Sequence, residues 1–283
     1  MKNNSSFRYF LITILNIIIT IAEFIGGIFS GSLALLSDAL HNLSDVGSIV
    51  IGFIANLIAK KPRNTHKTFG YQRAEILAAF MNGIILIVIS AYLIFEGIQR
   101  FATPEPVNGS VMLIVSVIGL LANLVSMLLL FKDSKNNLNA KATFLNMLSD
   151  ALSSIGVVLG AVVISIWQVY WLDPIITIVT SLFLLKEAYE VTKKAINIML
   201  ESNPGINLEQ VRAQIISLPQ IEDVHHVHVW QYSDNIIMLD AHINVSQAVE
   251  VKELDALYEK VKQQVKPFNI SHVTLQPESI NIN

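Results

Sequence analysis

Residues 40–45 read LHNLSD and residues 145–150 read LNMLSD, and each stretch lies inside a long apolar segment. Positions four apart share one face of a helix, so we expect His41 above Asp45, and Asn146 above Asp150. An ionisable residue is costly inside a membrane and usually serves a function there. Two helices that each present a pair of ligand atoms could therefore hold one four-coordinate metal ion between them.

The apolar segments around these motifs are long enough to cross a membrane. A span needs roughly 20 apolar residues, and six segments qualify, at about 9–29, 33–59, 76–99, 111–131, 142–167 and 173–194. Of the 283 residues, 53% are hydrophobic and only 14% are charged, against about 25% charged in a soluble domain. The first segment is too long for a signal peptide and lacks a small-residue cleavage site. We therefore expect six retained transmembrane helices.

Basic residues gather in alternate loops. Lys60, Lys61, Arg63, Lys67 and Arg73 follow the second segment, Lys132, Lys135 and Lys141 follow the fourth, and Lys186, Lys193 and Lys194 lie near the end of the sixth. The opposite loops carry almost no basic residue apart from Arg100. The positive-inside rule then predicts that both termini are cytoplasmic.

Composition excludes several kinds of function. The chain has no cysteine, which removes disulfides, thiolate metal ligands and thiol redox chemistry. A formal net charge of −3 does not favour a nucleic-acid partner. No phosphate-binding GxxxxGKS/T loop is present, and no nucleophile or general base stands beside the candidate metal site. We expect neither an ATPase nor another enzyme.

A soluble region begins after Glu201, where Asn203-Pro204-Gly205 breaks the last helix. Helices are expected at 207–217 and 248–266, and strands at 223–231, 236–245 and 270–276. The order αββαβ predicts a small two-layer α+β domain of ferredoxin-like type. The chain would thus divide into a six-helix transmembrane domain at 1–202 and a cytoplasmic domain at 203–283.

The intramembrane motifs offer oxygen and nitrogen ligands only. Neutral His41, the carboxylates of Asp45 and Asp150, and the carbonyl oxygen of Asn146 would neutralise a divalent ion. Such a set suits zinc and tolerates cobalt or cadmium, while an oxygen-rich set leans toward manganese. The alternative is that these groups hydrogen-bond one helix to another. That alternative suits Asn146 better than the two Asp residues, because a carboxylate at membrane depth needs a cation or a proton.

These motifs together resemble the cation diffusion facilitator family, close to its bacterial zinc/cobalt/cadmium efflux branch. TFGYQRAE at 68–75 and HVW at 228–230 resemble further family signatures, and the likeness covers nearly the whole chain. The resemblance implies a homodimer in the plasma membrane, without organic cofactor, that exports divalent metal by alternating access while protons move inward. It implies a transport site of His41, Asp45, Asn146 and Asp150.

The resemblance also implies a second metal site in the cytoplasmic domain and a charge pair at the membrane boundary. The implied ligands are His225, His242, His272 and Glu278, for which His226 or His228 could substitute. The plainer explanation is that these are surface or core histidines of a small sheet. The implied charge pair is Arg73 with Glu201, which would link the membrane part to the tail.

One departure from the family pattern concerns the identity of the metal. Zinc-selective members of the family usually have histidine where this chain has Asn146, and an amide oxygen is a harder ligand that does not titrate near neutral pH. A manganese-preferring or a cobalt/cadmium-preferring exporter is therefore the alternative, and a metal-responsive membrane sensor without transport is a further one. Asp38, one turn before His41, would be a solvated residue near the outer end of the span or in the lining of a cavity. It could instead act as an auxiliary ligand or proton relay.

Overall fold

The computed structural model describes residues 2–134, 138–246 and 250–279, and within these ranges it leaves some side chains undescribed, that of Asn146 among them. The chain forms two compact units. The first contains Met1–Phe53 and Met81–Thr192, and the second contains Ile54–Phe80 and Lys193–Asn283.

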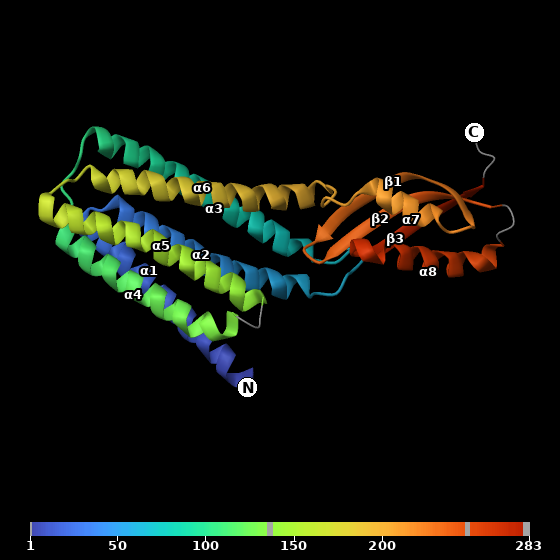
Figure 1. Ribbon diagram of the computed structural model, residues 1–283, viewed down its shortest axis with the longest axis horizontal. Helices are drawn as coiled ribbons and strands as arrows, with labels where there is room; N and C mark the ends of the chain where they lie inside the picture. Colours follow the sequence, from blue (N-terminus) through green and yellow to red (C-terminus); the bar gives the residue numbers. More distant parts are fainter. Residues whose placement is uncertain (1, 135–137, 247–249, 280–283) are drawn as a thin grey trace. The chain divides into compact units, whose positions relative to one another are not determined.

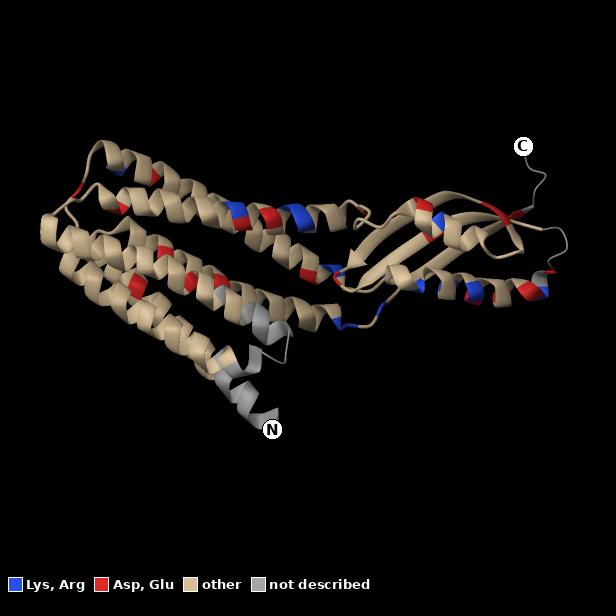
Figure 2. Cartoon of the chain, in the orientation of Figure 1, with Lys and Arg blue, Asp and Glu red and all other residues tan. Residues whose placement is uncertain are grey.

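Six long helices make up the greater part of the chain (Figure 1). They are α1 (Lys2–Ser30), α2 (Leu33–Ala59), α3 (Arg73–Ala102), α4 (Gly109–Ser134), α5 (Leu138–Trp167) and α6 (Leu172–Met199). Within the described residues, five stretches are long and apolar enough to cross a membrane: Leu11–Ser30, Leu33–Ala59, Arg73–Ala102, Gly109–Leu129 and Met147–Trp167. Figure 2 shows these helices free of Lys and Arg over most of their length. The predicted helical membrane domain is confirmed.

The sixth helix differs from the other five in its second half. The residues of α6 from 174 to 185 carry no charge, but Lys186, Glu187 and Glu190 follow within the next turn and a half. Its apolar run is therefore shorter than the predicted span of 173–194. The helix itself extends beyond that span because its polar second half continues to Met199.

Buried polar contacts fix the ends of four helices in the first unit. Gly31 takes a φ of 71° in the turn between α1 and α2, a value that favours glycine. Asp173, at the start of α6, accepts hydrogen bonds from the backbone N–H groups of Leu33 and Ala34, at 2.8 and 3.2 Å. Asp173 thus caps the start of α2 from another helix. Its negative charge also lies at the positive end of the α2 dipole, where a carboxylate is stabilising. Arg100 of α3 donates to the carbonyl of Gly31 at 2.7 Å.

Small and hydroxyl-bearing residues bring α6 against its neighbours. A Cβ on Gly83 of α3 would lie 2.2 Å from the Oγ1 of Thr192, so only glycine permits this approach. The hydroxyl of Ser37 on α2 lies 3.2 Å from that of Thr180 on α6. Contacts of this kind hold helices together in lipid, where apolar side chains gain little by meeting one another.

The C-terminal part of the chain forms the predicted α+β domain. Its elements are α7 (Leu208–Ile216), β1 (Ile221–Ser233), β2 (Ile236–Val245), α8 (Leu254–Val265) and β3 (Ile270–Ser279), with 3-10 turns at Val251–Glu253 and Lys266–Phe268. The sheet order is β1-β2-β3, with β1 antiparallel and β3 parallel to the central strand. The predicted αββαβ order is confirmed. The first residues of the predicted helix at 248–266 lie outside the described ranges.

Local sequence explains the boundaries of these elements. Asn207 caps α7 by accepting a hydrogen bond from the backbone of Gln210 at 3.2 Å. The β1–β2 hairpin turns at Asp234 and Asn235, both of which favour tight turns. Apolar residues of both helices and all three strands form one core, which includes Val211, Ile215, Val224, Leu239, Ile243, Val261 and Ile270. Alternation along the strands leaves the opposite face of the sheet to polar side chains.

Candidate metal centres

The two motifs that resemble each other meet between α2 and α5. The Nε2 of His41 lies 3.0 Å from the Oδ1 of Asp150. One ligand atom from each of His41, Asp45 and Asp150 can be chosen so that all lie within 4.8 Å of one another. Asp150 is buried, and His41 and Asp45 are half-buried. One nitrogen and two carboxylate oxygens at such distances can surround a single divalent cation.

Asn146 takes its place in α5 one turn before Asp150, on the same helical face. Its side chain lies outside the described part of the structure. Its role as fourth ligand therefore stays a prediction from the sequence.

Behind this group, buried hydrogen bonds connect further polar residues. Asp38 is 6% exposed. It accepts a hydrogen bond from the hydroxyl of Ser154 at 3.1 Å. Asn123 of α4 in turn donates to Ser154 at 3.4 Å. Asp38 thus lines the site from inside the protein and is tied to α5, one turn beyond Asp150.

Glu23 is a buried carboxylate that the motif analysis missed. It lies on α1 with only 1% of its surface exposed, and it accepts a hydrogen bond at 2.7 Å from Asn42, the neighbour of His41. The sequence did contain a signal for Glu23, namely a charged residue in an apolar helix. A carboxylate is as costly in the first span as it is at Asp45 and Asp150. Glu23 was overlooked because no second motif repeats it.

A cavity of about 520 Å³ lies beside the candidate transport site. Residues of α2, α5 and α6 line it, and His41, Asp38 and Asp150 are among them. Ser37, Ser149, Ser153 and Thr180 add hydroxyl groups to its wall. The side chains of two candidate ligands are thus in contact with a space large enough for a hydrated ion.

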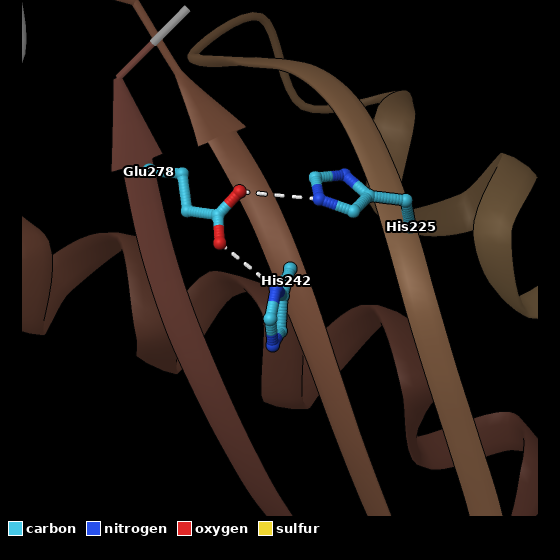
Figure 3. A group of neighbouring side chains, drawn as sticks. All are labelled: His225, His242 and Glu278. Carbon is cyan, nitrogen blue, oxygen red and sulfur yellow. Dashed lines mark ion pairs between the residues drawn. The ribbon is translucent and has the colours of Figure 1, made fainter. Parts of the chain in front are cut away.

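A second group of candidate ligands lies on the polar face of the sheet (Figure 3). The Nε2 of His225 lies 3.1 Å from one oxygen of Glu278, and the Nδ1 of His242 lies 2.8 Å from the other. These ligand atoms lie within 4.8 Å of one another. The strand register produces this grouping, because His225 pairs with His242 across the β1–β2 ladder. Two imidazoles and a carboxylate fit zinc well.

His272 is not brought to this group within one chain. It is exposed near the start of β3, where it pairs with Met238, whereas Glu278 pairs with Asn244. Six residues of extended strand separate it from Glu278, which corresponds to about 20 Å. His226 lies closer, with its ring centroid 4.7 Å from that of His242. Its φ of 51° places it in the bulge of β1 between His225 and His228.

Asp223 is a further residue that the sequence analysis did not single out. Its carboxylate lies 3.4 Å from the Nδ1 of His225, on the side of the ring away from Glu278. Arg212 of α7 donates to Asp223 at 2.7 Å, and this hydrogen bond holds the pKa of the Asp223 carboxyl below its ordinary value. A carboxylate behind a histidine fixes which ring nitrogen faces a metal. Asp223 therefore stands where a carboxylate could orient His225 toward Glu278.

The candidate charge pair lies within the second unit. The Nη2 of Arg73 is 3.0 Å from the Oε1 of Glu201, and the guanidinium also lies 5.0 Å from the centre of the Tyr232 ring. The hydroxyl of Tyr232 donates to the backbone carbonyl of Phe69 at 3.0 Å. The rings of Phe69 and Tyr232 also pack together, with their centroids 5.6 Å apart. Of these contacts among the described residues, the sequence predicted the pair of Arg73 and Glu201.

Comparison with known proteins gives the class to which this arrangement belongs. The family model described as "Cation efflux transmembrane domain" matches residues 9–200, and that described as "Cation efflux protein, cytoplasmic domain" matches residues 203–280. The chain belongs to the cation efflux, or cation diffusion facilitator, family of membrane transporters.

Among its relatives is the "Cadmium, cobalt and zinc/H(+)-K(+) antiporter" of Bacillus subtilis, 38% identical over 92% of this chain and 84% of that protein. The "Zinc transporter ZitB" of Escherichia coli is 36% identical over 91% of this chain and 82% of its own length. The "Metal cation efflux system protein CzcD" of Cupriavidus metallidurans is also 36% identical, over 91% and 82% respectively. The predicted likeness to the zinc/cobalt/cadmium branch is thereby confirmed.

Proposed function

We propose that the protein exports divalent metal cations, zinc first among them, and that the ion binds between α2 and α5. The observation that carries this proposal is the group of His41, Asp45 and Asp150 inside the helical unit. Helix α2 contains no Lys or Arg, and α5 contains only Lys141, near its start. Because two carboxylates at this depth need a positive charge, a bound divalent cation supplies what the helices lack.

Coupling to protons follows from the chemistry of these ligands. A histidine binds a metal only when the coordinating nitrogen is unprotonated, so metal and proton compete for His41. Loss of the ion on the outer side and its replacement by protons would return the carrier to the cytoplasmic side. The cycle needs binding and rearrangement of the helices, without covalent chemistry, an organic cofactor or enzymatic activity. The antiporter name of the Bacillus subtilis relative supports this coupling.

The metal preference of the transport site follows from its donors. The names of the relatives mention zinc, cadmium and cobalt, and a site of one imidazole and carboxylate oxygens accepts all three. With the amide oxygen of Asn146 as the fourth ligand, the set becomes harder than one with two histidines. The alternative is therefore an exporter that prefers manganese, cobalt or cadmium, and the identity of residue 146 would decide between this and a preference for zinc.

The second site belongs to the tail, and we assign it a regulatory ion. In this proposal a transport domain at 1–202 lies in the plasma membrane, and a cytoplasmic domain at 203–283 follows it. Both termini are cytoplasmic, and two copies of the chain form a dimer. His225, His242 and Glu278 would bind the ion from one chain. His272 would take part only in a metal held between two chains, because it is too far from the others within one.

A metal-responsive sensor without transport is the competing function. It would need the tail ligands but not the buried carboxylates of α2 and α5. The presence of both groups in one chain favours the exporter.

Metal flux into proteoliposomes of the purified full chain tests the proposal. With zinc outside and an acidic lumen, we expect uptake that collapses when the pH gradient is removed. Asp45→Asn should abolish uptake, and Asp255→Asn, which removes an exposed carboxylate of α8, serves as the matched control. Cadmium, cobalt and manganese are compared in the same assay. Flux that ignored both the gradient and Asp45 would refute the mechanism, and zinc binding without flux would favour the sensor.

A further inference from the structure

The cavity beside the transport site is lined by a carboxylate from a third helix, α6, for which the proposed function has no role. Among its lining residues, Asp38, His41 and Asp150 belong to α2 and α5, and the one charged residue contributed by α6 is Glu187. We propose that Glu187 is the capture residue of the transporter, which binds the divalent cation at the cavity before the ion reaches His41 and Asp150. This inference rests on the proposed function.

The first argument is the face of α6 on which Glu187 lies. The residues of this helix that line the cavity are Ile175, Ile176, Val179, Thr180, Phe183, Leu184 and Glu187. Their spacing of three and four marks a single helical face. Glu187 is the last member of this face and is exposed, whereas Asp38 and Asp150 are buried. Of the carboxylates that line the cavity, Glu187 is therefore the exposed one.

The second argument is the level of Glu187 along the helices. Ser37 and Thr180 touch, so they mark a common level on α2 and α6. Both helices run in the same direction, because successive helices alternate (Figure 1). Glu187 follows Thr180 by about 10 Å at 1.5 Å per residue, while His41 and Asp45 follow Ser37 by about 6 and 12 Å. The carboxylate thus lies between the levels of two candidate ligands.

The third argument is the charge around Glu187. The adjacent Lys186 is directed to Glu190, with its Nζ 4.0 Å from the Glu190 Oε1. Within the described ranges, no side chain forms an ion pair or hydrogen bond with Glu187. Glu187 lies just beyond the uncharged run of α6 at 174–185. Its carboxylate is the charged group of α6 that a cation entering this cavity would meet, and the lining of the same cavity also includes Asp38 and Asp150.

The alternative is that Glu187 is a solvated residue in the polar second half of α6. Glu190 provides the comparison, because it is an exposed carboxylate on the same helix, three residues later, and does not line the cavity. If charge at this end of α6 mattered only for solvation, the two residues would behave alike. If position at the cavity matters, only Glu187 affects the cation.

Initial rates of zinc uptake into proteoliposomes, measured against zinc concentration, separate these possibilities. For Glu187→Gln we expect the half-saturating zinc concentration to rise about tenfold, the low end of what charge steering gives, with the maximal rate unchanged. Glu190→Gln should match the wild type, and Glu187→Asp should restore most of the affinity. Higher ionic strength should raise the half-saturating concentration of the wild type and affect Glu187→Gln much less.

Equal concentration dependence of Glu187→Gln and Glu190→Gln would overturn the capture role. So would a loss of maximal rate at unchanged half-saturation, because that result would make Glu187 part of the conformational cycle. Normal wild-type flux in these experiments leaves the proposed function standing whatever Glu187 does. A wild type that takes up no metal would refute the exporter itself.

Discussion

The Nε2 of His41 lies 3.0 Å from the Oδ1 of Asp150, although 109 positions separate the two residues. A ring nitrogen that donates its proton to a carboxylate cannot bind a cation at the same time. A cation that bound through this Nε2 would therefore break the contact and displace the proton from that nitrogen, and loss of the cation would allow the contact to form again. The pair thus gives a local reason for exchange of metal against protons.

The first prediction concerns Asp150. Asp150→Asn keeps the shape of the side chain but removes one carboxylate ligand. We expect zinc uptake to fall at least about 100-fold, because loss of a ligand should cost more than loss of a residue that only hydrogen-bonds to a ligand. The helical circular dichroism of the purified protein should not change. Uptake above a tenth of the wild-type rate would show that the ion binds elsewhere.

The second prediction concerns the buried pair of Glu23 and Asn42. Glu23→Ala leaves the amide of Asn42 without its acceptor, which should cost about 1–3 kcal/mol. Glu23→Gln retains an oxygen that accepts the same hydrogen bond and should cost less. Thermal unfolding in detergent measures both variants. Equal losses would mean that the carboxylate charge, and not the hydrogen bond to Asn42, accounts for the stabilisation.

The helices could be predicted from the sequence because apolar length and the positions of polar residues suffice for that purpose. The contact between His41 and Asp150 was also predictable. Two similar motifs in two membrane helices can both supply ligands to one cation, and this requires that they lie side by side. The contact between Glu23 and Asn42 could not be predicted, because the sequence does not show whether Asn42 faces α1 or lipid. The same holds for the role of Asp173, whose bonds to the start of α2 depend on how helices far apart in the chain are placed.

In the sheet of the C-terminal domain, too, the sequence could not predict which side chains from different strands come together. The pairing of β1 with β2 brings His225 beside His242, and the pairing of β2 with β3 brings Glu278 to them. The position of His272 followed from the parallel register of β3, which no local pattern reveals. The bulge at His226 likewise arises from pairing between strands, so the sequence could not decide among the neighbouring histidines.

The third prediction concerns Asp223. Asp223→Asn weakens the group that orients His225, and we expect zinc affinity at the tail site to fall about 10–100-fold. Glu222→Gln changes the adjacent exposed carboxylate and should leave affinity unchanged. Calorimetric zinc titration of the full chain, carrying Asp45→Asn to weaken the transport site, gives both values. Identical affinities for the two variants would argue against an orienting role.

The fourth prediction concerns Arg73 and Glu201. Their side chains are 35% and 59% exposed, so the pair should contribute no more than about 1 kcal/mol to stability. We expect Arg73→Glu and Glu201→Arg each to slow zinc transport without a matching loss of thermal stability. The double variant, which restores a pair of opposite charges, should recover transport. A double variant as slow as the single ones would mean that the contact of Arg73 with Tyr232, or another contact, matters instead.

The last prediction concerns metal choice at Asn146. An imidazole at this position would replace a hard amide oxygen by a softer nitrogen, and such a set favours zinc over manganese. We therefore expect Asn146→His to raise the ratio of zinc to manganese transport, measured as competing initial rates in the same proteoliposomes. Asn146→Gln retains an amide on a longer side chain and should lower both rates without raising that ratio. If the ratio for Asn146→His equals that of the wild type, residue 146 does not coordinate the ion, and His41, Asp45 and Asp150 must select the metal without it.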